Sequence, residues 1–216
     1  MLEQLQSPWL QSGDKLLCLG DSLTAADPGY VQILTETLAR KNIQIFNAGV
    51  GGDKTPSTLA RLESVIKTVN ENKINAVSIF LGTNDAAIGH GIWADEPAVS
   101  PETYYDNLCW IVHLLKQRCN VKKFSIATPL WRFEGTTYAM HGDILKPYAL
   151  MARAAADKMQ TLLVPMDVVS EHFYQQNIQR RDPETGLLMT TDGTHPTGEV
   201  YRLIAETFMK FWQMAE

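Results

Sequence analysis

The chain has 216 residues, enough for one domain that buries about 70% of the surface of its unfolded chain. Hydrophobic residues make up 45% and charged residues 20%, a balance that excludes disordered, collagen-like and coiled-coil proteins. Nineteen Lys and Arg residues against 24 Asp and Glu residues give a net charge of -5, so we expect no nucleic acid as a partner.

The N-terminal stretch differs from a secretion signal. Glu3 stands where such a signal carries positive charge, and no continuous apolar core precedes Lys15. No apolar run approaches the length of a membrane span. We therefore expect a cytoplasmic protein without an integral membrane segment. Cys18, Cys109 and Cys119 are an odd number at irregular spacing, which indicates reduced side chains used in packing.

Short apolar runs alternate with stretches of helical periodicity, a pattern typical of parallel strands covered by helices on both faces. The candidate strands are, in chain order, Leu16–Leu19, Ile43–Asn47, Ala76–Gly82, Phe124–Pro129 and Leu162–Asp167. We find no repeat or linker, so we expect a single domain over residues 1–216. Its predicted fold is α/β, a three-layer α/β/α sandwich around a five-stranded parallel sheet.

Apolar residues between these runs recur at helical spacing within residues 30–38, 59–69, 104–115 and 200–211. Two of these helices carry a start signal. Thr55 precedes Pro56, and Ser100 precedes Pro101, so each pair places a capping hydroxyl before a proline at the first helical position. We expect Thr55 and Ser100 to be N-caps.

Polar motifs follow three of the candidate strands, where open parallel sheets bind their ligands. They are Gly20-Asp21-Ser22-Leu23, the segment from Asn47 to Gly52, and Gly82-Thr83-Asn84-Asp85; a fourth motif, from Asp192 to Pro196, precedes the last helix. Each motif alone is also typical of an ordinary turn. Their placement at one edge of the sheet predicts a common site.

Acyl transfer by a serine needs a base, a group that orients the base, and donors aimed at the developing oxyanion. His195 is the candidate base for Ser22, and Asp192 is the candidate partner of the second ring nitrogen. The N–H groups of Ser22 and Gly49 and the amide of Asn84 are candidate oxyanion donors. We thus predict the catalytic residues Ser22, Asp192 and His195, with no cofactor and no metal.

The four motifs, in this order, resemble the blocks of the SGNH hydrolases, the GDSL family of esterases and lipases. The matching residues span positions 20 to 196. The resemblance implies a flavodoxin-like sandwich, Ser22 as nucleophile with Asp192 and His195 as its partners, and an oxyanion hole formed by Ser22, Gly49 and Asn84. It implies an esterase acting on a small-molecule ester, and we favour small O-acetyl esters cleaved through an acyl-enzyme on Ser22. An acyl thioesterase or lysophospholipase of the same fold, and a non-catalytic binding module, remain alternatives.

Three other motif interpretations fit less well. Thr24 replaces the second glycine that the nucleophile elbow of α/β-hydrolases requires after its serine. The segment from Gly49 to Thr55 resembles a phosphate-binding loop, but Asp53 would repel phosphate. Asp21 and Asp27 make the first loop too acidic for the phosphate of a flavin.

Residues 86–99 and 130–147 are expected to overhang the site. Their large side chains form either a substrate platform or local packing; these are Trp93, Trp131, Phe133, Tyr138 and Met140. The histidines outside the motifs lack the spacing of metal ligands: we expect His113 to be solvated and His90, His141 and His172 to lie in loops. A homo-oligomer is left open, because exposed apolar loops serve equally as a lid or as a contact between copies.

Overall fold

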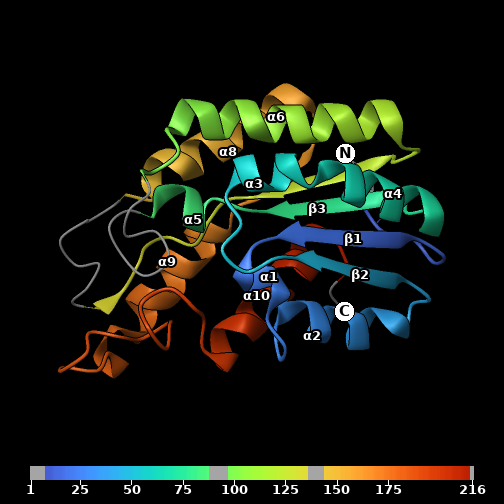
Figure 1. The fold of residues 1–216 in the computed structure, drawn as a ribbon. Coiled ribbons are helices and arrows are strands. Elements are labelled where there is room, and N and C mark those ends of the chain that lie inside the picture. Colours follow the sequence, from blue (N-terminus) through green and yellow to red (C-terminus); the bar gives the residue numbers. More distant parts are fainter. Residues whose placement is uncertain (1–7, 88–96, 136–143, 215–216) are drawn as a thin grey trace, which may run out of the picture.

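The computed structural model describes residues 8–87, 97–135 and 144–214 (Figure 1). Its sheet has five parallel strands in the order β2-β1-β3-β4-β5, which is the flavodoxin-like order. The strands are β1 (Lys15–Gly20), β2 (Gln44–Gly49), β3 (Ala76–Phe80), β4 (Lys123–Ala127) and β5 (Leu162–Val164). The predicted α/β sandwich around a five-stranded parallel sheet is confirmed.

Helices cover both faces of this sheet (Figure 1). On one side lie α3 (Thr55–Ala60), α4 (Leu62–Asn72), α6 (Pro101–Arg118) and α8 (Lys146–Met159). On the other lie α1 (Ser22–Ala25), α2 (Tyr30–Ala39), α9 (Met166–Asn177) and α10 (Gly198–Phe211). The short helix α5 (Thr83–Ala86) follows β3, and a 3-10 turn spans Ile178–Arg180. None of the helices in the described ranges combines the length and the apolar character that a membrane span needs.

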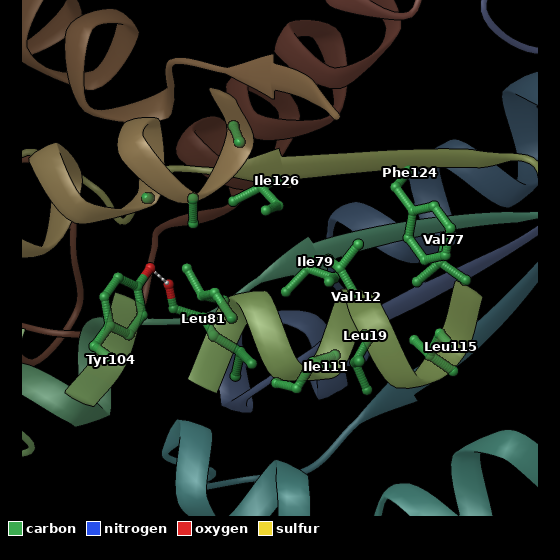
Figure 2. Packing of buried hydrophobic residues seen from close by; sticks show 14 of the residues in the cluster. Leu19, Val77, Ile79, Leu81, Tyr104, Ile111, Val112, Leu115, Phe124 and Ile126 are labelled. Carbon is green, nitrogen blue, oxygen red and sulfur yellow. Dashed lines mark hydrogen bonds between the residues drawn. The ribbon is translucent and has the colours of Figure 1, made fainter. Parts of the chain in front are cut away.

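The strands divide their side chains between two cores, because successive residues of a strand point to opposite faces. Leu17 and Leu19 of β1 pack under α4 and α6. Figure 2 shows Leu19 with Val77, Ile79, Phe124 and Ile126 of the neighbouring strands. Leu16 and Cys18 pack against α2 and α10 on the other face. Burial of each leucine stabilises the fold by about 1.5–3 kcal/mol. Because both faces of the sheet are buried, these strands are continuous apolar runs in the sequence.

The structure corrects several expected boundaries, including the end of β2, which lies at Gly49, two residues past the predicted Asn47. The last three strands end two or three residues before their predicted ends, and β5 stops at Val164 because Met166 already begins α9. The helical face over residues 59–69 is divided between α3 and α4, with Arg61 between them at φ -95° and ψ 7°. His172, predicted in a loop, is an exposed residue of α9.

One predicted helix cap is confirmed and the other is wrong. Ser100 caps α6 by accepting a hydrogen bond from the N–H of Thr103 at 3.1 Å. Thr55 is the first residue of α3 rather than its cap. Its N–H and its hydroxyl instead donate to the carboxylate of Asp85, at 3.0 and 2.5 Å. The acceptor at the start of α3 is therefore a carboxylate 30 residues away in sequence, whereas the local pattern predicts the threonine hydroxyl as the cap.

Candidate active site

The turn between β1 and α1 places Ser22 at the carboxyl edge of the sheet. Strand β1 ends at Gly20, and Asp21 is the N-cap of α1, with its Oδ1 atom accepting from the N–H of Leu23 at 2.9 Å. Ser22 is the first residue of this helix. β1 and β3 are neighbours in the sheet although β2 lies between them in sequence, and this switch in strand order is where flavodoxin-like sheets form their binding crevice.

Asp21 is buried behind Ser22, and this burial raises the pKa of its carboxyl to about 7. The negative charges of Asp85 and Asp53 raise the pKa further, whereas the hydrogen bond from Leu23 and the proximity of His195 lower it. The floor of the site therefore holds a carboxyl group whose ionisation is costly.

Three side chains form a hydrogen-bonded chain that begins at Ser22. The Nε2 atom of His195 lies 3.1 Å from Ser22 Oγ, and its Nδ1 atom lies 2.7 Å from Asp192 Oδ2. The contact between His195 and Ser22 joins residues 173 positions apart in sequence. A base next to a hydroxyl, with a carboxylate on its far nitrogen, is the arrangement that activates a serine for nucleophilic attack.

Asp192 also shapes the turn that carries His195. Its Oδ1 atom accepts from the backbone N–H groups of Thr194 and His195, at 2.9 and 2.8 Å. Partial burial raises the pKa of the Asp192 carboxyl, but the hydrogen bonds from His195 and Thr194 outweigh it and hold the pKa below its usual value. The carboxylate therefore stays ionised and can stabilise positive charge on the imidazole ring.

Gly49 lies beside Gly20 in the sheet register, at the end of β2. A Cβ atom at Gly49 would stand 2.3 Å from the backbone nitrogen of Ala25, so only glycine permits this contact with α1. The N–H of Gly49 donates to Asn47 Oδ1 at 2.8 Å, and Asn47 Nδ2 donates to the carbonyl of Thr24 at 2.8 Å. An oxyanion would have to share or displace this Asn47 contact, which motif reasoning did not anticipate.

Asn84 lies in α5 and its side chain is buried. Its Nδ2 atom donates to the carbonyl of Asp53 at 3.1 Å, which orients the amide. Gly82 precedes this helix with φ at 124°, a conformation that L side chains rarely adopt, and a Cβ atom there would meet the Tyr104 hydroxyl at 2.9 Å. The glycine thus permits the sharp turn between β3 and Asn84.

Arg61 joins the carboxyl ends of β1 and β2 to the loop that follows β2. Its Nε atom pairs with Asp53 Oδ2 at 2.6 Å, and its Nη2 atom donates to the carbonyl of Ala48 at 2.9 Å and of Gly20 at 3.4 Å. Asp53, which argued against a phosphate site, is thus the partner of an arginine. Sequence reasoning missed Arg61 and Asn47; Asn47 begins a recognised motif, whereas no local signal marks Arg61.

The described aromatic side chains of the expected overhanging loop are used in packing. Phe133 is buried in the core under α6 and α8. The Trp131 ring lies 5.1 Å from the ring of Tyr174 and 5.2 Å from the guanidinium carbon of Arg132. His113 is half-buried, with its ring 5.5 Å from that of Trp110. Trp93, Tyr138, Met140, His90 and His141 lie outside the described residues.

Within the described ranges, no three His, Cys, Asp or Glu side chains are grouped so that they could hold a metal ion. A serine, a histidine and an aspartate in this order, at the switch point of a parallel sheet, form an arrangement that suits ester hydrolysis. The class of protein to which the fold and this arrangement point is a hydrolase built on an α/β sandwich.

The chain belongs to the GDSL-like Lipase/Acylhydrolase family, whose model matches residues 18–203. It is 28% identical to an arylesterase of Vibrio mimicus over 205 residues, which cover 91% of this chain and 86% of that protein. It is 30% identical over 118 residues to a GDSL esterase/lipase of Arabidopsis thaliana, covering 53% of this chain and 48% of that one. These similarities identify the chain as a carboxylic ester hydrolase.

Solved structures share the fold at low sequence identity. Axe2, an acetylxylan esterase from Geobacillus stearothermophilus, matches with a TM-score of 0.75 at 22% identity, covering 94% of this chain and 95% of that one. LAE5, an enzyme from the metagenome of Lake Arreo, matches with a TM-score of 0.79 at 20% identity, covering 96% and 99%. The expected cytoplasmic location stays a prediction; a Bacillus subtilis protein that is 35% identical over 83 residues, 38% of this chain and 31% of that protein, is described as a lipoprotein.

Proposed function

We propose that the protein hydrolyses small carboxylic esters, O-acetyl esters above all, through an acyl-enzyme on Ser22. The observation that carries this proposal is the unbroken chain from Ser22 Oγ to His195 Nε2 at 3.1 Å and from His195 Nδ1 to Asp192 Oδ2 at 2.7 Å. The arylesterase among the similar proteins supports ester hydrolysis, and the name of the acetylxylan esterase supports an acetyl group.

In the acylation step, Ser22 Oγ attacks the ester carbonyl carbon while its proton passes to His195 Nε2. The carbonyl π electrons move to oxygen, and the resulting oxyanion accepts hydrogen bonds from the Ser22 N–H, the Gly49 N–H and the Asn84 amide. Collapse of this intermediate breaks the bond to the leaving alcohol oxygen, which takes the proton from His195. Ser22 then carries the acyl group as an ester.

Deacylation repeats these steps with water as the nucleophile. Water attacks the acyl carbon as its proton passes to His195, and collapse of the second intermediate returns that proton to Ser22 Oγ and releases the carboxylic acid. Asp192 stabilises the imidazolium formed in each half-reaction. In this scheme the Gly49 N–H shares its hydrogen bond between Asn47 and the oxyanion.

A related protein supports the same assignment. Structures of Axe2 variants at a serine, an aspartate and a histidine are described as catalytic mutants, and the last two positions are three residues apart in that chain. Asp192 and His195 have the same spacing. We infer the same roles for Ser22, Asp192 and His195 here.

Hydrolysis of p-nitrophenyl acetate, butyrate and octanoate by wild type and Ser22→Ala tests the proposal, with EDTA present in a parallel series. We expect Ser22-dependent, EDTA-insensitive hydrolysis that falls with chain length. A rate that rises with length would instead favour a thioesterase or lysophospholipase. Absence of Ser22-dependent turnover, together with no labelling by a fluorophosphonate, would favour a binding module.

A further inference from the structure

Glu134 is a buried carboxylate in the loop after β4, far in sequence from the motifs of the site. Its side chain is 2% exposed and forms no ion pair with any Lys or Arg of the described ranges. A buried charge without a counter-ion is costly unless several donors satisfy it. The donors to Glu134 therefore indicate what the charge is used for.

All four hydrogen bonds to this carboxylate come from one short segment. Oε2 accepts from the N–H groups of Met189 and Thr190, at 2.8 and 2.7 Å, and from Thr190 Oγ1 at 2.6 Å. Oε1 accepts from the N–H of Leu188 at 3.2 Å. These bonds are charge-assisted, and they hold the backbone at the start of the turn that carries Asp192 and His195.

The same loop and the same threonine also reach the tip of this turn. The N–H of Glu134 donates to the carbonyl of Gly193 at 2.9 Å, and Thr190 Oγ1 accepts from the N–H of Gly193 at 3.1 Å. Thr191 donates to the carbonyl of His195 at 2.8 Å. The base of the turn is thus buried and tied to Glu134, while about half of the His195 side chain, 46%, is exposed.

We propose that Glu134 is a positioning residue that sets the distance between His195 Nε2 and Ser22 Oγ by holding residues 188–190. The inference rests on the proposed function of Ser22, Asp192 and His195. Glu134 does not touch the reacting atoms; it acts through the backbone of the turn. An exposed histidine on a turn that is not held would sample other positions, and a shift of about 1 Å at a catalytic group costs up to about 10²-fold in rate.

The central variant is Thr190→Val, which keeps the side-chain shape and removes the hydroxyl that bonds both Glu134 and Gly193. We expect kcat on p-nitrophenyl acetate to fall about tenfold with KM within about twofold, because the base is displaced and binding is not. Thr190→Ser restores the hydroxyl and should restore kcat. Glu134→Gln can keep an acceptor for the three Oε2 bonds and should lose less activity than Glu134→Leu.

Thr128→Val is the matched control. Thr128 is buried like Thr190 but lies in the loop after β4, and its hydroxyl exchanges hydrogen bonds with Asp167 at 2.7 and 2.9 Å, away from the turn. We expect Thr128→Val to lose about as much stability in urea unfolding as Thr190→Val does, with kcat unchanged from wild type. A structural role alone would make kcat insensitive to both valine substitutions.

The hydrogen-bonded Nδ1 proton of His195, observed by NMR in the free protein and assigned through its loss in His195→Ala, gives a readout independent of turnover. We expect the signal to broaden or disappear in Thr190→Val and to persist in Thr128→Val. Wild-type kcat and an unchanged signal in Thr190→Val would overturn this inference alone. A wild type without Ser22-dependent hydrolysis would overturn the proposed function and, with it, the positioning role.

Discussion

Replacement of Asp192 by asparagine isolates the electrostatic part of the proposed mechanism. In Asp192→Asn the amide oxygen can keep the two backbone bonds that Oδ1 accepts from Thr194 and His195, at 2.9 and 2.8 Å, so the turn is retained. The amide NH₂ then faces His195 Nδ1, where the carboxylate oxygen stood at 2.7 Å. Because this group donates, it favours the tautomer with the ring proton on Nε2, which cannot accept the proton of Ser22.

The wrong tautomer alone lowers kcat by about 10⁴ when the triad is enclosed. Here the side chains of His195 and Asp192 are 46% and 54% exposed, so water can stabilise the productive tautomer in part of the molecules. We therefore expect kcat on p-nitrophenyl acetate to fall about 10³-fold, equivalent to about 4 kcal/mol of barrier. KM should stay within about threefold, because the mechanism gives Asp192 no contact with the substrate.

Asp182→Asn is the matched control for this variant. Asp182 Oδ1 accepts from the N–H groups of Glu184 and Thr185, at 2.9 and 2.6 Å, in a turn of the same type that carries no part of the proposed site. Its kcat should equal that of wild type. If Asp192→Asn kept more than about a tenth of the wild-type kcat, the carboxylate would not set the tautomer of His195, and the proposed role of Asp192 would be refuted.

Two further predictions concern the oxyanion and the buried carboxyl group. Asn84→Ala should lower kcat by about 10²–10³ through loss of one oxyanion donor, whereas Asn75→Ala, which removes a 2.7 Å bond to Asp14 at the other end of the sheet, should not. Asp21→Asn should gain stability relative to wild type as pH rises. The wild-type carboxyl has its pKa raised by burial from 3.8 to about 7, so its contribution is fully present below about pH 4 and is lost as pH passes 7. In urea titrations, the unfolding free energy of Asp21→Asn relative to that of wild type should rise by about 4 kcal/mol between pH 4 and pH 8.

Each of these predictions has a clear contrary result. An unchanged kcat in Asn84→Ala would reduce Asn84 to a turn residue held by its bond to Asp53. A stability difference between Asp21→Asn and wild type that is the same at pH 4 and pH 8 would show that the ionisation of Asp21 carries no folding penalty.

Local pattern was enough to predict the layers of the fold. Continuous apolar runs occur where strands are buried on both faces, and each of β1 to β5 overlaps its predicted segment. The Ser100-Pro101 signal predicted the start of α6 because its cap is local: the Thr103 N–H lies within the same turn of helix. The local signal for the start of α3 is wrong because the acceptor for the Thr55 N–H is Asp85 of α5, 30 residues away in sequence.

The candidate site likewise contains residues that local motifs predict and contacts that they do not. Ser22, Asn84, Asp192 and His195 stand in short motifs whose residue types suit acyl transfer, and the order of parallel strands predicts that the first two share an edge of the sheet. The sequence did not predict three tertiary contacts. Asn47 accepts from the Gly49 N–H, Arg61 joins two strand ends, and Glu134 holds the turn that carries His195. A hydrogen-bond partner 55 residues away leaves no periodic or spacing signal.

The sequence by itself therefore determined the fold class, the edge of the sheet that carries the chemistry and the residue types gathered there, because periodicity, capping and turn motifs are properties of neighbouring residues. Only the tertiary structure decided the distances: His195 Nε2 lies 3.1 Å from Ser22 Oγ, and the turn that carries His195 is bonded to a carboxylate from the loop after β4. Such contacts depend on how the chain packs over its whole length, and reactivity depends on them to within about 1 Å.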